Sequence, residues 1–256
     1  PEMAPTDNMA IDEILFLEEI NKRTFPITLR FYNWSSPAFS FGYFSGIPES
    51  IISIVNAQHG KYFVRRLTGG GWVFHSGDIP FTLIIDIEQI KEANSIQQSY
   101  KMIHSIVLGA LKKTGITSII MSENKNRASG SCFTTPVSGD ILMSGKKILG
   151  GAQRRRKGVL LYQGSLMLNR PSSKITSFIP EKYNFLNEII KNTSSIEFLT
   201  SNKLSQDKIA ASISKSFSLA CSICFQDIPL TNYEKEKAVK LAEKKYSTLQ
   251  WTTNRR

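Results

Sequence analysis

The segment Arg65–His75, RRLTGGGWVFH, places three consecutive glycines between two stretches that alternate like strands, directly after two arginines. Because glycine has no Cβ, Gly69–Gly71 let a ligand approach the backbone closely and leave N–H groups that can face an anion. No Gly-Lys-Ser/Thr sequence ends this run, so it is not a Walker phosphate loop. The segment therefore predicts either a ligand-binding loop or a glycine-rich β-turn.

A second segment, Gly145–Arg156, reads GKKILGGAQRRR and combines glycines with basic side chains. If residues 148–152 form a strand, Lys147 lies just before it and can project its ammonium group into space left open by the Gly150–Gly151 backbone. Positive charge without a nearby counter-ion favours a phosphate or carboxylate ligand. A basic run taken alone, however, is more typical of a solvated face or a nucleic-acid patch.

Hydrophobic periodicity around these segments indicates a mixed α+β chain. Thr6-Asp7-Asn8 can cap a helix that runs to about Lys22, and Ile96–Leu111 has the spacing of a long amphipathic helix that stops before Gly115. Further helices are expected at 50–58, 209–217 and 234–246, and strands at 27–31, 39–43, 62–66, 81–85, 116–121, 141–143, 148–152, 159–161 and 165–168. No repeat or linker divides the chain. We expect one domain over residues 1–256, with a helical C-terminal part from about residue 200.

Composition and charge are those of a globular protein with an acidic or phosphate-bearing partner. The chain has 256 residues, 41% hydrophobic and 21% charged, with a net charge of +11. The basicity is local, because residues 144–157 carry six bases and no acid. No run is long enough to span a membrane, and three cysteines favour free thiols in a reducing compartment, so the expected location is the cytoplasm.

Four segments together resemble the superfamily of lipoate-protein ligases, biotin ligases and octanoyltransferases. They are Asn8–Glu13, the glycine segment Arg65–His75, the lysine segment Gly145–Gln153, and Gln163–Ser165. The resemblance spans nearly the whole chain. It implies an α+β catalytic domain of the biotin/lipoate-ligase type, with a central mixed β-sheet flanked by helices and an apolar tunnel that holds an acyl chain.

The resemblance also assigns roles to residues. Lys147 matches the active-site lysine, whose charge would stabilise the negative charge that grows on the acyl carbonyl during transfer. The residues that match the substrate- and nucleotide-binding positions are Arg66, Thr68, Gly69, Gly70, Gly71, His75, Asp140, Gly150, Gly151 and Ala152. His75 is more typical of a packed, hydrogen-bonded core histidine than of a catalytic one. No metal-ligand set is predicted.

Two chemistries compete within this family. Ligases activate lipoate with ATP and Mg²⁺ and attach it to a lysine of a lipoyl carrier domain, in 2-oxoacid dehydrogenase complexes or the glycine cleavage H protein. Octanoyltransferases take octanoate from acyl carrier protein through a cysteine thioester, and Cys132 matches that nucleophile in one transferase group. The intact Gly69–Gly71 run and the Gly139-Asp140-Ile141 sequence favour the ligase, which is our main expectation. A ligase of this length could need a separate accessory polypeptide.

The remaining cysteines and the basic run 154–157 allow two weaker interpretations. Cys221 and Cys224 lack partner ligands at zinc spacing and continue a helical stripe, so we expect packing cysteines rather than a metal site. The basic run could bind nucleic acid, but no helix-turn-helix, zinc-finger or aromatic RNA-binding pattern accompanies it. Nucleic acid is therefore the distant alternative.

Overall fold

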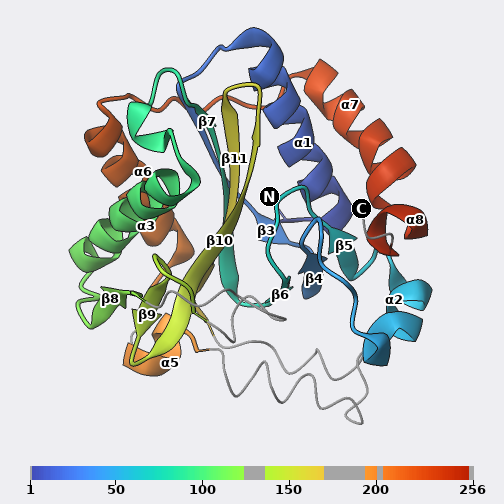
Figure 1. Cartoon of the computed structure of the whole chain (residues 1–256), viewed down its shortest axis with the longest axis horizontal. Coiled ribbons are helices and arrows are strands. Elements are labelled where there is room, and N and C mark those ends of the chain that lie inside the picture. The colour runs from blue at the N-terminus through green and yellow to red at the C-terminus, as the bar shows by residue number, and fades with distance from the viewer. Residues whose placement is uncertain (1, 124–135, 170–193, 201–203, 254–256) are drawn as a thin grey trace.

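The computed structural model describes residues 2–123, 136–169, 194–200 and 204–253. Its centre is a six-stranded sheet in the order β2-β7-β11-β10-β9-β8, in which every ladder is antiparallel. The strands of this sheet are β2 (Ile27–Phe31), β7 (Asp78–Asp86), β8 (Ile119–Met121), β9 (Ile141–Met143), β10 (Lys146–Arg156) and β11 (Val159–Met167). The predicted α+β class with a central sheet flanked by helices is confirmed (Figure 1).

Parallel pairing occurs in two smaller sheets beside the central one. In a three-stranded sheet, β4 pairs in parallel with β5 and antiparallel with β6, and β1 pairs in parallel with β3. These strands are β1 (Glu2–Met3), β3 (Asn33–Trp34), β4 (Ala38–Phe41), β5 (Phe63–Arg65) and β6 (Trp72–His75). The glycine segment is the connection from β5 to β6, so it joins two edges of one small sheet.

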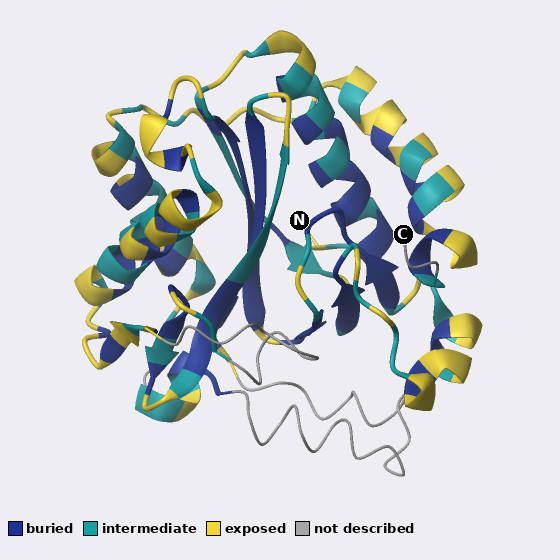
Figure 2. Cartoon of the chain, viewed as in Figure 1, coloured by how far each residue is buried: buried dark blue, intermediate teal, exposed yellow. Residues whose placement is uncertain are grey.

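Helices cover both faces of the central sheet because its long strands are apolar on both sides. Along β7, Phe81 and Leu83 pack with the cluster under α3 and α6, whereas Ile84 packs with the cluster under α1. Figure 2 shows β7 and β11 buried along their length between these layers. The helices are α1 (Pro5–Lys22), α2 (Ile52–Gln58), α3 (Ile96–Lys113), α5 (Ile196–Thr200), α6 (Gln206–Cys221), α7 (Asn232–Leu241) and α8 (Leu249–Thr253), with a π-helical turn at Ala242–Tyr246.

Three sequence expectations were wrong in detail. Helix α1 begins at Pro5 after Ala4 rather than at a Thr6–Asn8 cap, and the Asn8 amide instead donates to the backbone carbonyls of Met3 and Asn33. The two short strands expected at 159–161 and 165–168 are one strand, β11, since its glycine continues the ladder. The helix expected over 234–246 is α7 followed by the π-helical turn.

The described part of the chain contains no helix long and apolar enough to cross a membrane.

Candidate active site

Lys147 lies at the start of β10, where a bulge between Lys147 and Leu149 interrupts the pairing with β9. Its side chain is 4% exposed, and its ammonium nitrogen lies 2.8 Å from Oδ2 of Asp140. A Cβ on Gly150 would lie 2.1 Å from Cε of Lys147, so only glycine leaves room for the lysine there. The expectation that this charge lacks a counter-ion was therefore wrong, because Asp140 neutralises it.

Asp140 is itself fixed by neighbouring donors. The Tyr100 hydroxyl donates to Oδ1 at 2.6 Å, and the Val137 backbone N–H donates to Oδ2 at 2.8 Å. Burial, and after it the charge of Asp140, raises the pKa of Tyr100 well above its ordinary value, so the phenol stays a donor. The carboxylate is thus held in one orientation toward Lys147. The sequence alone singled out Asp140 for nucleotide binding and missed Tyr100.

A buried histidine on α3 supports Tyr100 from behind. The His104 ring stacks on the Tyr100 ring at a centroid distance of 4.0 Å, and its Nε2 lies 2.7 Å from the Tyr162 hydroxyl. Burial, and then the charge of Lys147, lowers the pKa of His104 to about 3. The imidazole is therefore neutral at physiological pH. The only signal in the sequence was a histidine four residues after Tyr100 on the apolar face of a helix.

A pocket opens between the central sheet and the small sheet, and its lining includes Gly150, against which the Lys147 side chain lies. One wall is the glycine-containing part of β10 and β11, and the opposite wall comes from β4, β6 and α1. Its lining residues are Met9, Tyr32, Trp34, Ser40, Arg66, Val73, His75, Gly150, Gly151, Ala152, Gln163, Gly164 and Ser165. The structure thus brings together Arg66, His75 and the 150–152 backbone, which lie far apart in the sequence.

The glycine loop Gly69–Gly71 is held against the body of the protein by Arg66. The Arg66 guanidinium donates to the carbonyls of Gly69 at 2.7 Å and Gly71 at 2.9 Å, and to the carbonyl of Ser40 at 2.9 Å. A Cβ on Gly42 would lie only 2.0 Å from the carbonyl oxygen of Gly70. The loop therefore packs backbone to backbone on Gly42, a residue that the sequence analysis missed.

His75 has the environment of a packed, hydrogen-bonded histidine. Its Nε2 lies 2.8 Å from the Ser40 hydroxyl, and its Nδ1 lies 2.7 Å from Oδ2 of Asp78. The Trp34 ring packs on the imidazole at a centroid distance of 4.5 Å. Both ring nitrogens are thus engaged inside the protein while one edge lines the pocket.

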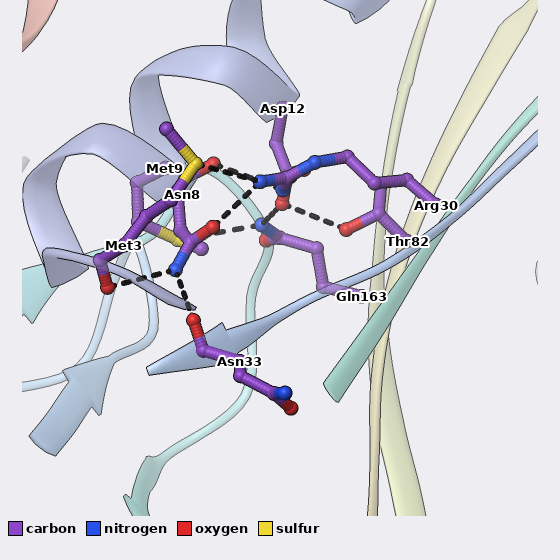
Figure 3. A network of polar contacts seen from close by, with 8 residues as sticks. All are labelled: Met3, Asn8, Met9, Asp12, Arg30, Asn33, Thr82 and Gln163. Carbon is purple, nitrogen blue, oxygen red and sulfur yellow. Dashed lines mark hydrogen bonds and ion pairs between the residues drawn. The ribbon is translucent and has the colours of Figure 1, made fainter. Parts of the chain in front are cut away.

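Thr68 is hydrogen-bonded to Gln163, which lines the pocket and belongs to the polar network drawn in Figure 3. Its hydroxyl donates to Gln163 Oε1 at 2.8 Å, and Gln163 Nε2 donates to Asp12 Oδ2 at 2.7 Å. Asp12 also accepts from Arg30 and Thr82, at 2.8 and 2.7 Å. Burial raises the pKa of Asp12, and these donors oppose that rise.

Two of the four side chains in the basic run 154–157, those of Arg154 and Arg155, make intramolecular contacts, whereas Arg156 and Lys157 are exposed. Arg154 lies over the Tyr43 ring and donates to the Leu67 carbonyl. Arg155 donates to the carbonyls of Ala93 and Asn94. These contacts weaken the interpretation of this run as a nucleic-acid patch.

The cysteines that the structure describes lie at the end of α6 and just after it. Cys221 ends α6 and packs half-buried against the core, as predicted, whereas Cys224 is exposed. Cys132 lies outside the described residues. Within the described segments, no group of three or more His, Cys, Asp or Glu side chains could hold a metal ion.

Comparison with known proteins identifies the family. The sequence profile described as "Lipoyl protein ligase A/B catalytic domain" matches residues 4–218. This chain belongs to that family. It is accordingly an enzyme of the lipoate ligase and octanoyltransferase group, as expected from its glycine and lysine segments.

Relatives within the lipoyl protein ligase A/B family are similar over nearly their whole length. The chain is 29% identical to octanoyltransferase LipM of Halalkalibacterium halodurans, covering 96% of this chain and 94% of the relative. It is 30% identical to octanoyltransferase LipM of Oceanobacillus iheyensis, covering 94% and 90%. The fold is also that of a putative lipoate protein ligase from T. acidophilum with bound lipoic acid, at a TM-score of 0.73 and 23% identity, covering 97% and 93%.

Proposed function

We propose that this protein is an octanoyltransferase, which moves an octanoyl group from acyl carrier protein to a lysine of a lipoyl carrier domain. The observation that carries the proposal is the similarity to octanoyltransferases over more than nine-tenths of this chain. It reverses our expectation of an ATP- and Mg²⁺-dependent lipoate ligase. The two features that favoured the ligase do not require a nucleotide, because Asp140 pairs with Lys147 and Gly69–Gly71 pack on Gly42.

The pocket supports binding of an acyl chain with its carbonyl at Lys147. Burial of apolar surface contributes about 0.8 kcal/mol per CH₂ group, so an eight-carbon chain gains enough to be held without a charged anchor at its tail. The buried ammonium group of Lys147 can stabilise an oxyanion that develops on the carbonyl, and Asp140 keeps it oriented. His75, Arg66 and Ala152 would form the walls.

The proposed chemistry has two transfers. The Cys132 thiolate attacks the thioester carbonyl of octanoyl acyl carrier protein, forming an enzyme thioester and releasing the carrier thiol, which takes up a proton. The neutral amine of the lipoyl-domain lysine then attacks the enzyme thioester, forming the amide, and its lost proton leaves the site as Cys132 is regenerated. Lys147 would stabilise the tetrahedral oxyanion in both steps.

Mass spectrometry tests this proposal directly. Wild-type enzyme incubated with octanoyl acyl carrier protein should gain one octanoyl group on Cys132, and hydroxylamine should remove it. Cys132→Ala should gain none and transfer none, whereas the matched control Cys224→Ala, at an exposed cysteine, should behave as wild type. A wild type that stays unmodified but catalyses lipoate-dependent pyrophosphate exchange with ATP and Mg²⁺ would establish the ligase instead.

The acceptors that we propose are the lipoyl domains of 2-oxoacid dehydrogenase complexes or the glycine cleavage H protein. A transferase receives an activated acyl group, so adenylation and an accessory polypeptide for it are not required. A structural neighbour with a TM-score of 0.69 is described as part of a bi-partite lipoate protein ligase studied with its E2 lipoyl domain. Transfer to isolated lipoyl domains and to the H protein, measured side by side, would rank the acceptors.

A further inference from the structure

One side chain that lines the pocket has both polar atoms of its amide group fixed by hydrogen bonds. Gln163 lines the pocket, is 8% exposed, and belongs to the network drawn in Figure 3. Its carbonyl accepts from Thr68 and its amide donates to Asp12, with the Met9 sulfur 3.4 Å from the same nitrogen. Both hydrogen-bonding atoms of the amide group are thus engaged. If the side chain rotated away, the buried Thr68 hydroxyl and Asp12 carboxylate would each lose a hydrogen-bond partner.

Gln163 lies farther along β10 than the Lys147 side chain does. Lys147 lies over Gly150, and Gln163 pairs with Ala152, two residues farther along the strand. This separation along the strand is about 7 Å. An acyl chain with its carbonyl at Lys147 that follows β10 would therefore run toward the Gln163 side chain.

A second cavity lies farther along the same face of β10. Its lining includes Arg154, two residues beyond Ala152, together with Glu13 and Leu67, which adjoin Asp12 and Thr68 in sequence. Tyr43, Lys245 and Trp251 complete its lining. Space is therefore available along β10 beyond the position of Gln163.

We propose that Gln163, locked by Thr68 and Asp12, is the end wall of the acyl pocket and limits the length of the acyl chain that it accepts. The inference rests on the proposed function for the identity of the acyl ligand. Shortening this side chain opens the pocket toward the second cavity and admits longer chains. Replacing it with an apolar side chain of similar length breaks the network but leaves the wall in place.

The test compares Gln163→Ala with Gln163→Leu, using octanoic, decanoic and dodecanoic acids as ligands in titration calorimetry. Wild type and Gln163→Leu should bind octanoic acid best and lose affinity beyond it. Gln163→Ala should prefer the longer acids. Each extra buried CH₂ is worth about fourfold in affinity, so the ratio of dodecanoic to octanoic affinity should rise more than tenfold relative to wild type. Gln163→Asn, which keeps the amide, should shift the preference by about one methylene group if the alanine variant does not fold.

Three results would contradict the assignment of Gln163 as the end wall of the pocket. They are an unchanged eight-carbon preference in the folded shortened variants, an equal shift in Gln163→Leu, and no binding of octanoic acid to the wild type. Octanoyl transfer from acyl carrier protein is measured separately. If octanoyl transfer fails while the three acids bind with the expected dependence on chain length, the proposed transferase chemistry is wrong but the assignment of Gln163 as the end wall is supported.

Discussion

Tyr100 is the residue through which the fold controls the orientation of the Lys147–Asp140 pair. Its hydroxyl contacts Asp140 and also accepts from the Gly151 N–H at 3.3 Å. Removing a hydrogen bond to a charged group costs about 1.5–3 kcal/mol, and each 1.4 kcal/mol is about tenfold in rate. Tyr100→Phe should therefore lower the rate of acyl transfer by tenfold or more in single-turnover measurements, with little change in KM for the lipoyl domain.

An exposed tyrosine provides the control for that prediction. Tyr233 is 53% exposed on α7, so Tyr233→Phe should leave transfer unchanged. If Tyr100→Phe lost rate only in proportion to a loss of folded protein, as seen by circular dichroism, its role would be structural rather than positioning.

His104 makes stability depend on pH in a calculable direction. Its ordinary pKa of 6.5 is lowered by burial to about 3 in the folded protein. Below pH 6.5, His104 therefore binds a proton in the unfolded chain but stays neutral in the folded protein. The contribution of His104 to the free energy of unfolding is fully present above pH 6.5 and is lost as the pH falls toward 3. The expected loss is about 2 kcal/mol between pH 8 and pH 5.

Urea denaturation across this range measures the effect. His104→Gln should flatten the fall in unfolding free energy between pH 7 and pH 5, whereas His59→Gln, at a histidine bonded only to a nearby backbone carbonyl among the described contacts, should keep the wild-type slope. If the free energy of unfolding depended on pH equally in wild type and His104→Gln, protonation of His104 would not be the cause of the pH dependence.

At the scale of elements, the glycine loop depends on a contact between two backbones. A Cβ at Gly42 would collide with the carbonyl of Gly70, which cannot move as a flexible side chain could. Gly42→Ala should therefore displace the loop and reduce acyl transfer at least a hundredfold, because misplaced binding groups act throughout the reaction. Gly46→Ala, only four residues away, meets nothing within 4 Å and should retain activity. Similar activities of the two variants would show that the loop position does not matter for transfer.

The elements also show what the sequence could and could not predict. Helix α3 was predicted nearly to its ends and the central part of the long strand β7 was predicted as a strand, because apolar periodicity is local information. The β5–β6 glycine loop and Lys147 were recognisable since their chemistry needs particular residue types next to one another. The contacts of Gly42 with Gly70 and of Tyr100 with Asp140 were not, because they join residues that only the tertiary fold brings together.

At the scale of the whole molecule, the C-terminal helices anchor the strand that leads into the glycine loop. Helix α7 and the π-helical turn pack on α1, and the Trp251 indole N–H donates to the Arg65 carbonyl at 2.9 Å. The Arg65 guanidinium in turn donates to the carbonyls of Trp251 and Thr252. The β5 end of the glycine loop is therefore anchored by residues 186 and 187 positions away in sequence. Periodicity predicted these helices but could not reveal this contact.

The net positive charge of the whole molecule can attract an acidic carrier domain, and the basic residues of β10 are candidates for the contact. Arg155 and Arg156, in the basic run near the end of β10, are candidates for contacting an acidic carrier domain. Arg155 is bound to backbone carbonyls, and Arg156 lies nine residues from Lys147, about 30 Å along the strand. Lys146 is half-buried beside Lys147 at the start of β10, so its charge lies closer to the site lysine than that of Arg156 does.

The dependence of transfer on salt tests this assignment. A charge of +11 should speed the encounter with an acidic carrier, and added salt screens it because the Debye length shortens to about 8 Å at physiological ionic strength. The kcat/KM for the carrier should thus fall several-fold as salt rises, with kcat nearly constant.

Lys146→Gln should lower kcat/KM at low salt and weaken its salt dependence, whereas Arg156→Gln, at the other end of β10, should do neither. Acyl transfer from a small uncharged octanoyl thioester should stay independent of salt in all three proteins. A salt-independent kcat/KM for the carrier, or an effect of Arg156→Gln as large as that of Lys146→Gln, would contradict steering by the charge near Lys147.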